Sequence, residues 1–150
     1  MTRTRRLGPW LEHRCGLRVR FCEVDAIQVA WHGHYVAWFE VGREAFGEAY
    51  GLGWRELRDA GLVAPVVQLS CDYLLPARAG DELVVVTRWH PSERAAIELS
   101  YEVRDAASDA LLARGRTVQV FTDLAGNLLL TQPPLLAAFR AQWADQLTGG

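Results

Sequence analysis

The sequence predicts an α+β fold in which an antiparallel sheet wraps around one long helix. Apolar and polar residues alternate in five separate segments, which is typical of half-buried strands. Residues 35–50 instead place apolar side chains at steps of three and four, as a helix does. One long helix among so many strands favours hairpin connections over the crossovers of a parallel sheet.

The first predicted strand covers residues 17–24. Its alternation puts Leu17, Val19 and Phe21 on one face, which we expect to be buried. The strand leads into the helix of residues 35–50, whose first half carries apolar side chains on several sides. Such a helix is expected to be enclosed rather than laid on a surface.

After the helix, glycines end the helical pattern and residues 54–61 form a short helical turn. Four further strands are predicted, at residues 62–75, 81–90, 95–105 and 110–123. Most of their links are short enough for hairpins. A closing helix with proline at its first positions is predicted for residues 133–147.

A sheet of this kind leaves a long edge strand without a partner. The unpaired N–H and C=O groups along such an edge can pair with a second copy of the chain. We therefore predict a homodimer or a dimer of dimers. Residues 1–150 are expected to form a single domain with one core. Within this domain, residues 1–12 are expected to be a flexible tail.

The composition is that of a globular protein, with 50% hydrophobic and 23% charged residues. Sixteen basic against eighteen acidic residues leave a net charge of −2, so neither nucleic acid nor a membrane surface is an expected partner. All the basic residues are arginine. The absence of lysine excludes Schiff-base, pyridoxal and P-loop chemistry, because each needs a lysine at the reacting centre.

The cysteines and the N-terminal residues suggest a location. Three cysteines stand far apart, without a C-x-x-C pair, which suits a reducing compartment. The basic start of the chain lacks the apolar stretch of a secretory signal. We therefore expect a cytoplasmic protein.

The chemistry is expected between the first strand and the helix. Asp25 stands at the end of the strand, and the helix starts about eight residues later. The N–H groups of a helix start lack intrahelical partners and carry a positive charge of about half a unit. A substrate carbonyl placed against them would be polarised, and Asp25 could attack it or draw a proton from water. In a second interpretation, Asp25 is a turn former that hydrogen-bonds its own backbone.

The stretch VDAIQVAWHGHYVAWFEVGRE resembles the signature of the 4-hydroxybenzoyl-CoA thioesterase family of hotdog-fold enzymes, especially its acyl-CoA thioesterase branch. In outline, that signature has an aspartate, a short loop, His-x-x-Tyr, Trp-Phe-Glu and a trailing Arg-Glu. The matching residues are Asp25, His32, Tyr35, Trp38, Phe39, Glu40, Arg43 and Glu44. LLPARAGDELVV is similar to a second recurring stretch, and the resemblance covers about residues 17–135.

The resemblance implies a hotdog fold and a hydrolase that converts acyl- or aryl-CoA thioesters into free acid and CoA, without a metal or another cofactor. Asp25 would be the catalytic carboxylate, and the backbone N–H of His32 would polarise the thioester carbonyl. The family usually has glycine at the position of Gln28 and asparagine at that of His34. Both departures affect the substrate more than the reaction type. The thioester carrier is either CoA or acyl carrier protein.

Side chains around the helix start and in two loops complete the predicted site. Trp31, Gly33 and Tyr35 are expected to contact the substrate, whereas most other aromatic residues belong to the core. Because the chain lacks lysine, arginines would have to meet the phosphates of CoA. Arg78 and Arg94 are the candidates.

Two other functions stay open. A hotdog hydratase or dehydratase also uses an acid and a histidine, but with a spacing that differs from that of Asp25 and His32. A non-catalytic thioester-binding module is the other alternative, and Gln28 and His34 are the features that favour it. No metal site is predicted, because histidines two apart on a helix point in different directions and no third ligand stands near.

Overall fold

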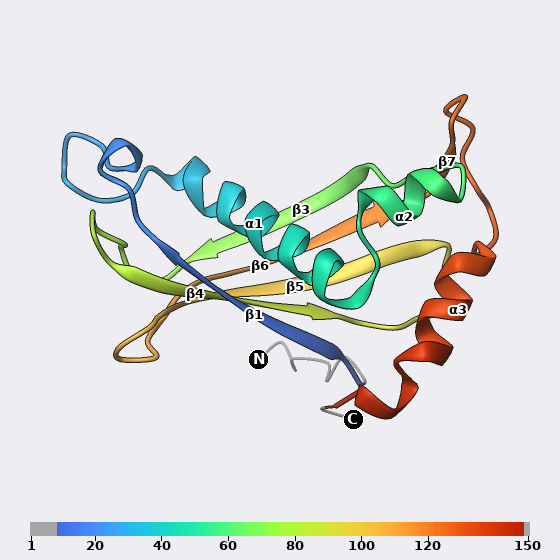
Figure 1. The fold of residues 1–150 in the computed structure, drawn as a ribbon. Helices are drawn as coiled ribbons and strands as arrows, with labels where there is room; N and C mark the ends of the chain where they lie inside the picture. The colour runs from blue at the N-terminus through green and yellow to red at the C-terminus, as the bar shows by residue number, and fades with distance from the viewer. Residues whose placement is uncertain (1–8, 149–150) are drawn as a thin grey trace, which may run out of the picture.

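The computed structural model describes residues 9–148, which form a five-stranded antiparallel sheet with a long helix across one face (Figure 1). In chain order the elements are β1 (Leu11–Arg18), η1 (Phe21–Glu23), α1 (His32–Tyr50), α2 (Trp54–Asp59), β2 (Leu62–Val63), β3 (Val66–Tyr73), β4 (Glu82–Trp89), β5 (Ala96–Asp105), β6 (Leu111–Val120), β7 (Thr122–Asp123), α3 (Pro134–Gln142) and η2 (Ala144–Gln146). The sheet order is β1-β4-β5-β6-β3, and β2 pairs separately with β7. The predicted α+β architecture is confirmed.

The first strand lies earlier in the chain than the sequence indicated. β1 pairs with β4 over its whole length, from Leu11 opposite Trp89 to Arg18 opposite Glu82. Because β4 begins at Glu82, the chain after Arg18 has no strand to pair with and turns into η1. The prediction of a strand over 17–24 is therefore wrong for most of its length, and Phe21 is 84% exposed rather than buried.

The N-terminal prediction needs a related correction. Leu11 and Glu12 belong to β1, so a flexible tail over residues 1–12 is wrong at its last two positions. Residues 1–8, which make up most of the expected tail, lie outside the described residues. The assignment of residues 1–150 to one domain stays a prediction.

The later strands differ from the predicted run of hairpins. The expected strand of residues 62–75 is divided at Pro65, which has no N–H group to donate to a neighbouring strand, into β2 and β3. The expected strand of residues 110–123 is likewise divided into β6 and β7. Hairpins join β4, β5 and β6, whereas β3 crosses over to pair with β6. This crossover leaves β1 and β3 at the two edges of the sheet.

Helix α1 packs along one face of this sheet (Figure 1). Its buried residues are Tyr35, Trp38, Phe39, Gly42, Phe46 and Gly47. Val41 and the acidic residues beside it face solvent, so the helix is enclosed on one side only. The expectation of a fully enclosed helix is therefore wrong within one chain, because the sheet covers one side of α1 and leaves the other side in solvent.

The remaining elements close the ends of the core. α3 is shorter than the predicted helix of residues 133–147, and its Phe139 packs edge-on against Trp89, with ring centroids 4.9 Å apart. None of the helices in residues 9–148 has the length and apolar character needed to cross a bilayer.

Candidate active site

Backbone hydrogen bonds between residues a few positions apart close the loop between η1 and α1 into a tight turn. The N–H of Asp25 donates to the carbonyl of Val29 at 2.9 Å, and the N–H of Gln28 donates to the carbonyl of Asp25 at 3.0 Å. Val24 and Ala30 form a bridge on either side of this turn. Asp25 therefore lies at the base of the turn and close to the start of α1.

Gln28 occupies a position that favours glycine. Its φ of 66° lies in the left-handed region, where a side chain costs about 1–2 kcal/mol. The family resemblance places glycine here, so the backbone conformation fits the motif although the residue departs from it. The side chain is exposed, and Gln28 does not line the pocket that contains Asp25.

The carboxylate of Asp25 has one bonded and one free oxygen. Oδ1 accepts a hydrogen bond from the N–H of Ile27 at 2.9 Å, which is the turn-forming contact of the second interpretation. Within residues 9–148, Oδ2 takes part in no hydrogen bond or ion pair. Asp25 lines a pocket whose other lining residues are Val29, Ala30, His32, Tyr35, Tyr73, Leu74, Leu75 and Pro76.

The start of α1 offers unpaired donors to this pocket. Trp31 is the N-cap residue, and no side chain caps the helix. The N–H of Trp31 donates to the carbonyl of Glu23 at 2.9 Å, whereas those of His32 and Gly33 have no acceptor in the described part of the chain. Such amides bind negative charge. Asp25 and His32, the first residue of α1 with an unpaired N–H, thus line the same pocket, whereas Gly33 and Trp31 do not line it.

The two aromatic residues predicted to contact the substrate differ in burial, since Trp31 is exposed and Tyr35 is buried. Trp31 is 50% exposed, and its ring covers Gly33 so closely that a Cβ there would lie 2.1 Å from it. Gly33 is thus needed for the position of the Trp31 ring. Tyr35 is buried, and its hydroxyl accepts a hydrogen bond from the N–H of Ala77 at 2.9 Å. Tyr35 forms the inner wall of the pocket.

The sequence interpretation did not include Tyr73 among the site residues. Tyr73, at the end of β3, donates its hydroxyl hydrogen to the carbonyl of His32 at 2.7 Å and packs edge-on against Tyr35. Burial, together with the neighbouring Cys71, raises the pKa of Tyr73 to about 12, so the hydroxyl remains a donor at physiological pH. Only the crossover of β3 places it here, and no local pattern predicts that.

Glu23 is the second residue that the sequence interpretation missed. It lies two positions before Asp25, and its side chain is buried. An acid two residues before a candidate catalytic acid is the only sequence signal for it.

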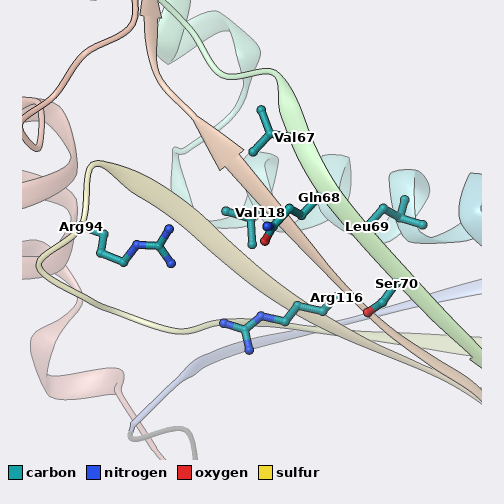
Figure 2. Close-up of a pocket in the computed structure, with 7 residues that line it drawn as sticks. All are labelled: Val67, Gln68, Leu69, Ser70, Arg94, Arg116 and Val118. Carbon is teal, nitrogen blue, oxygen red and sulfur yellow. The ribbon is translucent and has the colours of Figure 1, made fainter.

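The two predicted arginines lie in different places. Arg78 belongs to the turn after Ala77, whose carbonyl accepts the N–H of Ala30 at 2.8 Å, so Arg78 is close to the Asp25 loop. Arg94 instead lines a second pocket along β3, shown in Figure 2, and its Nη1 lies 2.6 Å from Glu98 Oε1. The two pockets share no lining residue. Within one chain, Arg94 and Asp25 are therefore not brought together.

The two histidines of the first helical turn both pack against the Trp31 ring, with centroids 4.8 and 5.5 Å away, but their other neighbours differ. The ring of His32 stands edge-on to Tyr73, whereas Nδ1 of His34 lies 3.9 Å from Oε2 of Glu23. This divergence follows from their spacing on a helix. Across residues 9–148, no three His, Cys, Asp or Glu side chains gather in a group that could hold a metal ion.

Comparisons with known proteins agree with this picture. A family model described as the thioesterase-like superfamily matches residues 19–143. YneP of Bacillus subtilis, a provisionally named acyl-CoA thioesterase, is 32% identical over 71 residues, which are 47% of this chain and 51% of YneP. The chloroplastic acyl-acyl carrier protein thioesterase ATL3 of Arabidopsis thaliana is 25% identical over 111 residues, or 74% of this chain and 58% of ATL3. The chain thus spans little more than half the length of these curated relatives.

A solved structure extends the comparison to three dimensions. The 4-hydroxybenzoyl-CoA thioesterase in complex with 4-hydroxybenzoyl-CoA superposes with a TM-score of 0.74. It covers 85% of this chain and 97% of that protein, at 19% identity. Likeness at this identity shows the fold alone. Together with the family match, it confirms the predicted hotdog fold.

Proposed function

We propose that this chain, which belongs to the thioesterase-like superfamily, hydrolyses acyl- or aryl-CoA thioesters to the free acid and CoA. One observation carries the proposal: Asp25 lines the same pocket as His32, the first residue of α1, whose backbone N–H has no acceptor in residues 9–148. The narrower family of the sequence resemblance is not part of the proposal, because 4-hydroxybenzoyl-CoA thioesterase is a neighbour in fold only.

The proposed reaction needs one carboxylate and one amide. The N–H of His32 donates a hydrogen bond to the carbonyl oxygen of the thioester and stabilises the negative charge that develops on that oxygen. Asp25 takes a proton from water as the resulting hydroxide adds to the carbonyl carbon. The carbon–sulfur bond then breaks, the acid is released, and the thiolate takes up the proton from Asp25. In the alternative route, the Asp25 carboxylate attacks the carbonyl carbon, the carbon–sulfur bond breaks and the thiolate leaves. Water then hydrolyses the resulting anhydride to the acid and the free Asp25 carboxylate, and the thiolate takes up the proton that is released.

A thioester suits this simple site better than an amide does, because sulfur overlaps weakly with the carbonyl and a thiolate leaves readily. In the proposal, Trp31 and Tyr35 contact the acyl or aryl group, and Gly33 leaves room for the Trp31 ring. Arg78, near the Asp25 loop, meets a phosphate of the carrier. The names of YneP and ATL3 support CoA and acyl carrier protein, respectively, as carriers.

We also propose that the working unit is a homodimer formed along β3. This edge strand exposes residues on both faces, with Leu69 and Tyr73 on one face and Gln68 and Ser70 on the other. Pairing two β3 strands antiparallel would satisfy their free backbone groups. It would also bring the Val67 end of the partner's strand beside the Tyr73 end of this one, so that the partner would help to line the Asp25 pocket.

The substitution Asp25→Asn tests the proposed reaction. Asparagine keeps an oxygen that can accept the Ile27 N–H, so the loop is expected to hold, whereas the basic and nucleophilic oxygen is lost. We expect turnover to fall by about 10³-fold or more, while substrate binding changes little. The measurement is thiol release, with a chromogenic disulfide, from a panel of aliphatic and aromatic CoA thioesters.

Asp59→Asn is the matched control, because Asp59 is exposed on α2 and should leave turnover unchanged. Full hydrolysis by the Asp25→Asn variant would exclude the proposed role. An enoyl-CoA whose absorbance falls without thiol release would instead indicate a hydratase. Binding of thioesters without either signal in the wild type would indicate a binding module.

A further inference from the structure

Glu23 is a charged side chain enclosed beside the candidate active site. It is 4% exposed. Its Oε1 accepts the backbone N–H of Arg20 at 2.8 Å, and its Oε2 accepts the indole N–H of Trp38 at 3.0 Å. A buried carboxylate is tolerated only when such donors replace water. Burial raises the pKa of Glu23, but these hydrogen bonds outweigh it and hold the pKa below its usual value.

Glu23 contacts residues that come before Asp25 in the sequence and residues that come after it. Its backbone carbonyl accepts the N–H of Trp31, the N-cap residue of α1, at 2.9 Å. Its carboxylate reaches Trp38, in the second turn of the same helix. One residue thus joins the beginning of the Asp25 loop to the helix at two points. The proposed mechanism does not use this side chain.

We infer that Glu23 is a positioning residue, which holds the Asp25 loop against the first two turns of α1. This inference rests on the proposed function. The distance that matters is the gap between the Asp25 carboxylate and the N–H of His32, because a reacting carbonyl must fit between them. A misplacement of about 1 Å can cost about 10²-fold in rate. Among residues 9–148, the hydrogen bonds of Asp25 are all to the backbone of its own loop.

Two basic side chains also lie near the Glu23 carboxylate, but the contact that matters most is with Trp38. Nε of Arg20 lies 3.4 Å from Oε1, and Nδ1 of His34 lies 3.9 Å from Oε2. Arg20 is largely exposed, so water screens its pair with Glu23. The indole of Trp38 is the buried partner, and its hydrogen bond to Glu23 is the connection that a variant should break.

The substitution Glu23→Gln removes the charge and one acceptor while keeping the size. We expect kcat to fall about 10- to 100-fold and KM to change less than about threefold, because the substrate contacts remain and only their alignment with Asp25 is lost. Trp38→Phe removes the indole donor and should lower kcat in the same way. The single oxygen of glutamine can serve only one of the two donors, the Arg20 N–H and the Trp38 indole, so both variants weaken the same connection. In the double variant the two losses should therefore be less than additive. Glu48→Gln, on the exposed face of α1, is the matched control.

Hydrogen exchange gives a readout that does not depend on activity. In Glu23→Gln, the amides of residues 24–31 should exchange faster than in the wild type, while those of β4 and β5 should not change. Should Glu23→Gln fail to fold, Trp38→Phe carries the test. Unchanged kcat with unchanged loop exchange overturns the inference, as does an equal loss of protection throughout the sheet. If the wild type hydrolyses no thioester, the proposed function fails and loop exchange alone decides the positioning role.

Discussion

The turn-forming contact of Asp25 is compatible with the chemical role proposed for this residue. The N–H of Ile27 donates a hydrogen bond to Oδ1, as expected if Asp25 is a turn former. This contact leaves Oδ2 free to act on a substrate. A carboxylate with one oxygen fixed has fewer orientations to lose when a substrate binds. The turn that looked like an alternative to catalysis is therefore compatible with it.

Gln28 illustrates a departure that the backbone tolerates. The motif implies glycine, and the observed φ of 66° explains why glycine suits this position. The sequence interpretation expected an effect on the substrate. Within one chain, the Gln28 side chain lies outside the Asp25 pocket. Its effect there is strain in the backbone of the loop, caused by the left-handed φ.

At the residue scale, His90 should make folding stability depend on pH. It is 8% exposed, and its Nε2 lies 2.6 Å from Ser100 Oγ. Burial, helped by Arg116 and Arg88 and opposed by Glu98, lowers the pKa of His90 to about 4. An unfolded histidine titrates near 6.5, so the unfolded chain binds more protons between these values. The contribution is complete above about pH 6.5 and is lost as the pH falls towards 4.

Urea unfolding of the wild type and of His90→Gln checks this prediction. Between pH 6.5 and 5, the wild type should lose about 1.5 kcal/mol more of its free energy of unfolding than the variant does. Parallel losses in the two proteins would show that His90 is not the responsible group.

At the scale of elements, the contact between α1 and the sheet depends on glycine. The ring of Phe39 lies on Gly115 of β6 and stacks on Tyr101, with centroids 4.7 Å apart. On the same helix, a Cβ at Gly42 would lie 2.5 Å from Oγ1 of Thr87. These close approaches hold α1, and with it the helix start at the pocket, at a fixed distance from the strands.

The matched pair Gly115→Ala and Gly16→Ala tests this packing. A Cβ at Gly115 would lie 2.3 Å from Phe39 and 2.5 Å from the backbone oxygen of Ser70, so helix and strand must both shift. We expect a loss of about 1–3 kcal/mol in the free energy of unfolding. At Gly16 the nearest atom is 3.9 Å away, so the change should stay within about 0.5 kcal/mol. Equal effects in urea unfolding would contradict the packing argument.

For the whole molecule, β3 is the edge strand through which we propose that two chains associate. It is an edge strand, it borders both pockets, and its side chains are mostly exposed. Val67→Lys would place a charge on that edge and should weaken the proposed dimer by at least about tenfold in its dissociation constant. Sedimentation velocity across a dilution series measures the change.

Val41→Lys adds the same charge to the exposed face of α1 and should leave the β3 association intact. Thiol release should fall together with the dimer in Val67→Lys, because the partner strand is proposed to line the pocket. A wild type that stays monomeric at micromolar concentration would remove the dimer proposal and leave the reaction to be tested on one chain.

The sequence by itself determined the kinds of element and pointed to the segment that holds the candidate site. Alternating residues marked the strands, the three–four spacing marked α1, and the motif placed Asp25 before a helix start. These features depend on residues a few positions apart, and local geometry suffices for them. The error at β1 fits this rule, since the end of that strand depends on where its distant partner β4 begins.

Only the tertiary structure decided which distant segments meet. The crossover of β3 to β6 brings Tyr73 to His32, the loop contacts bury Glu23, and Arg94 lies in another pocket from Asp25. The energy of burying or pairing a side chain depends on the surface that faces it, and that surface comes from residues far away in the chain. No pattern along the sequence contains that information.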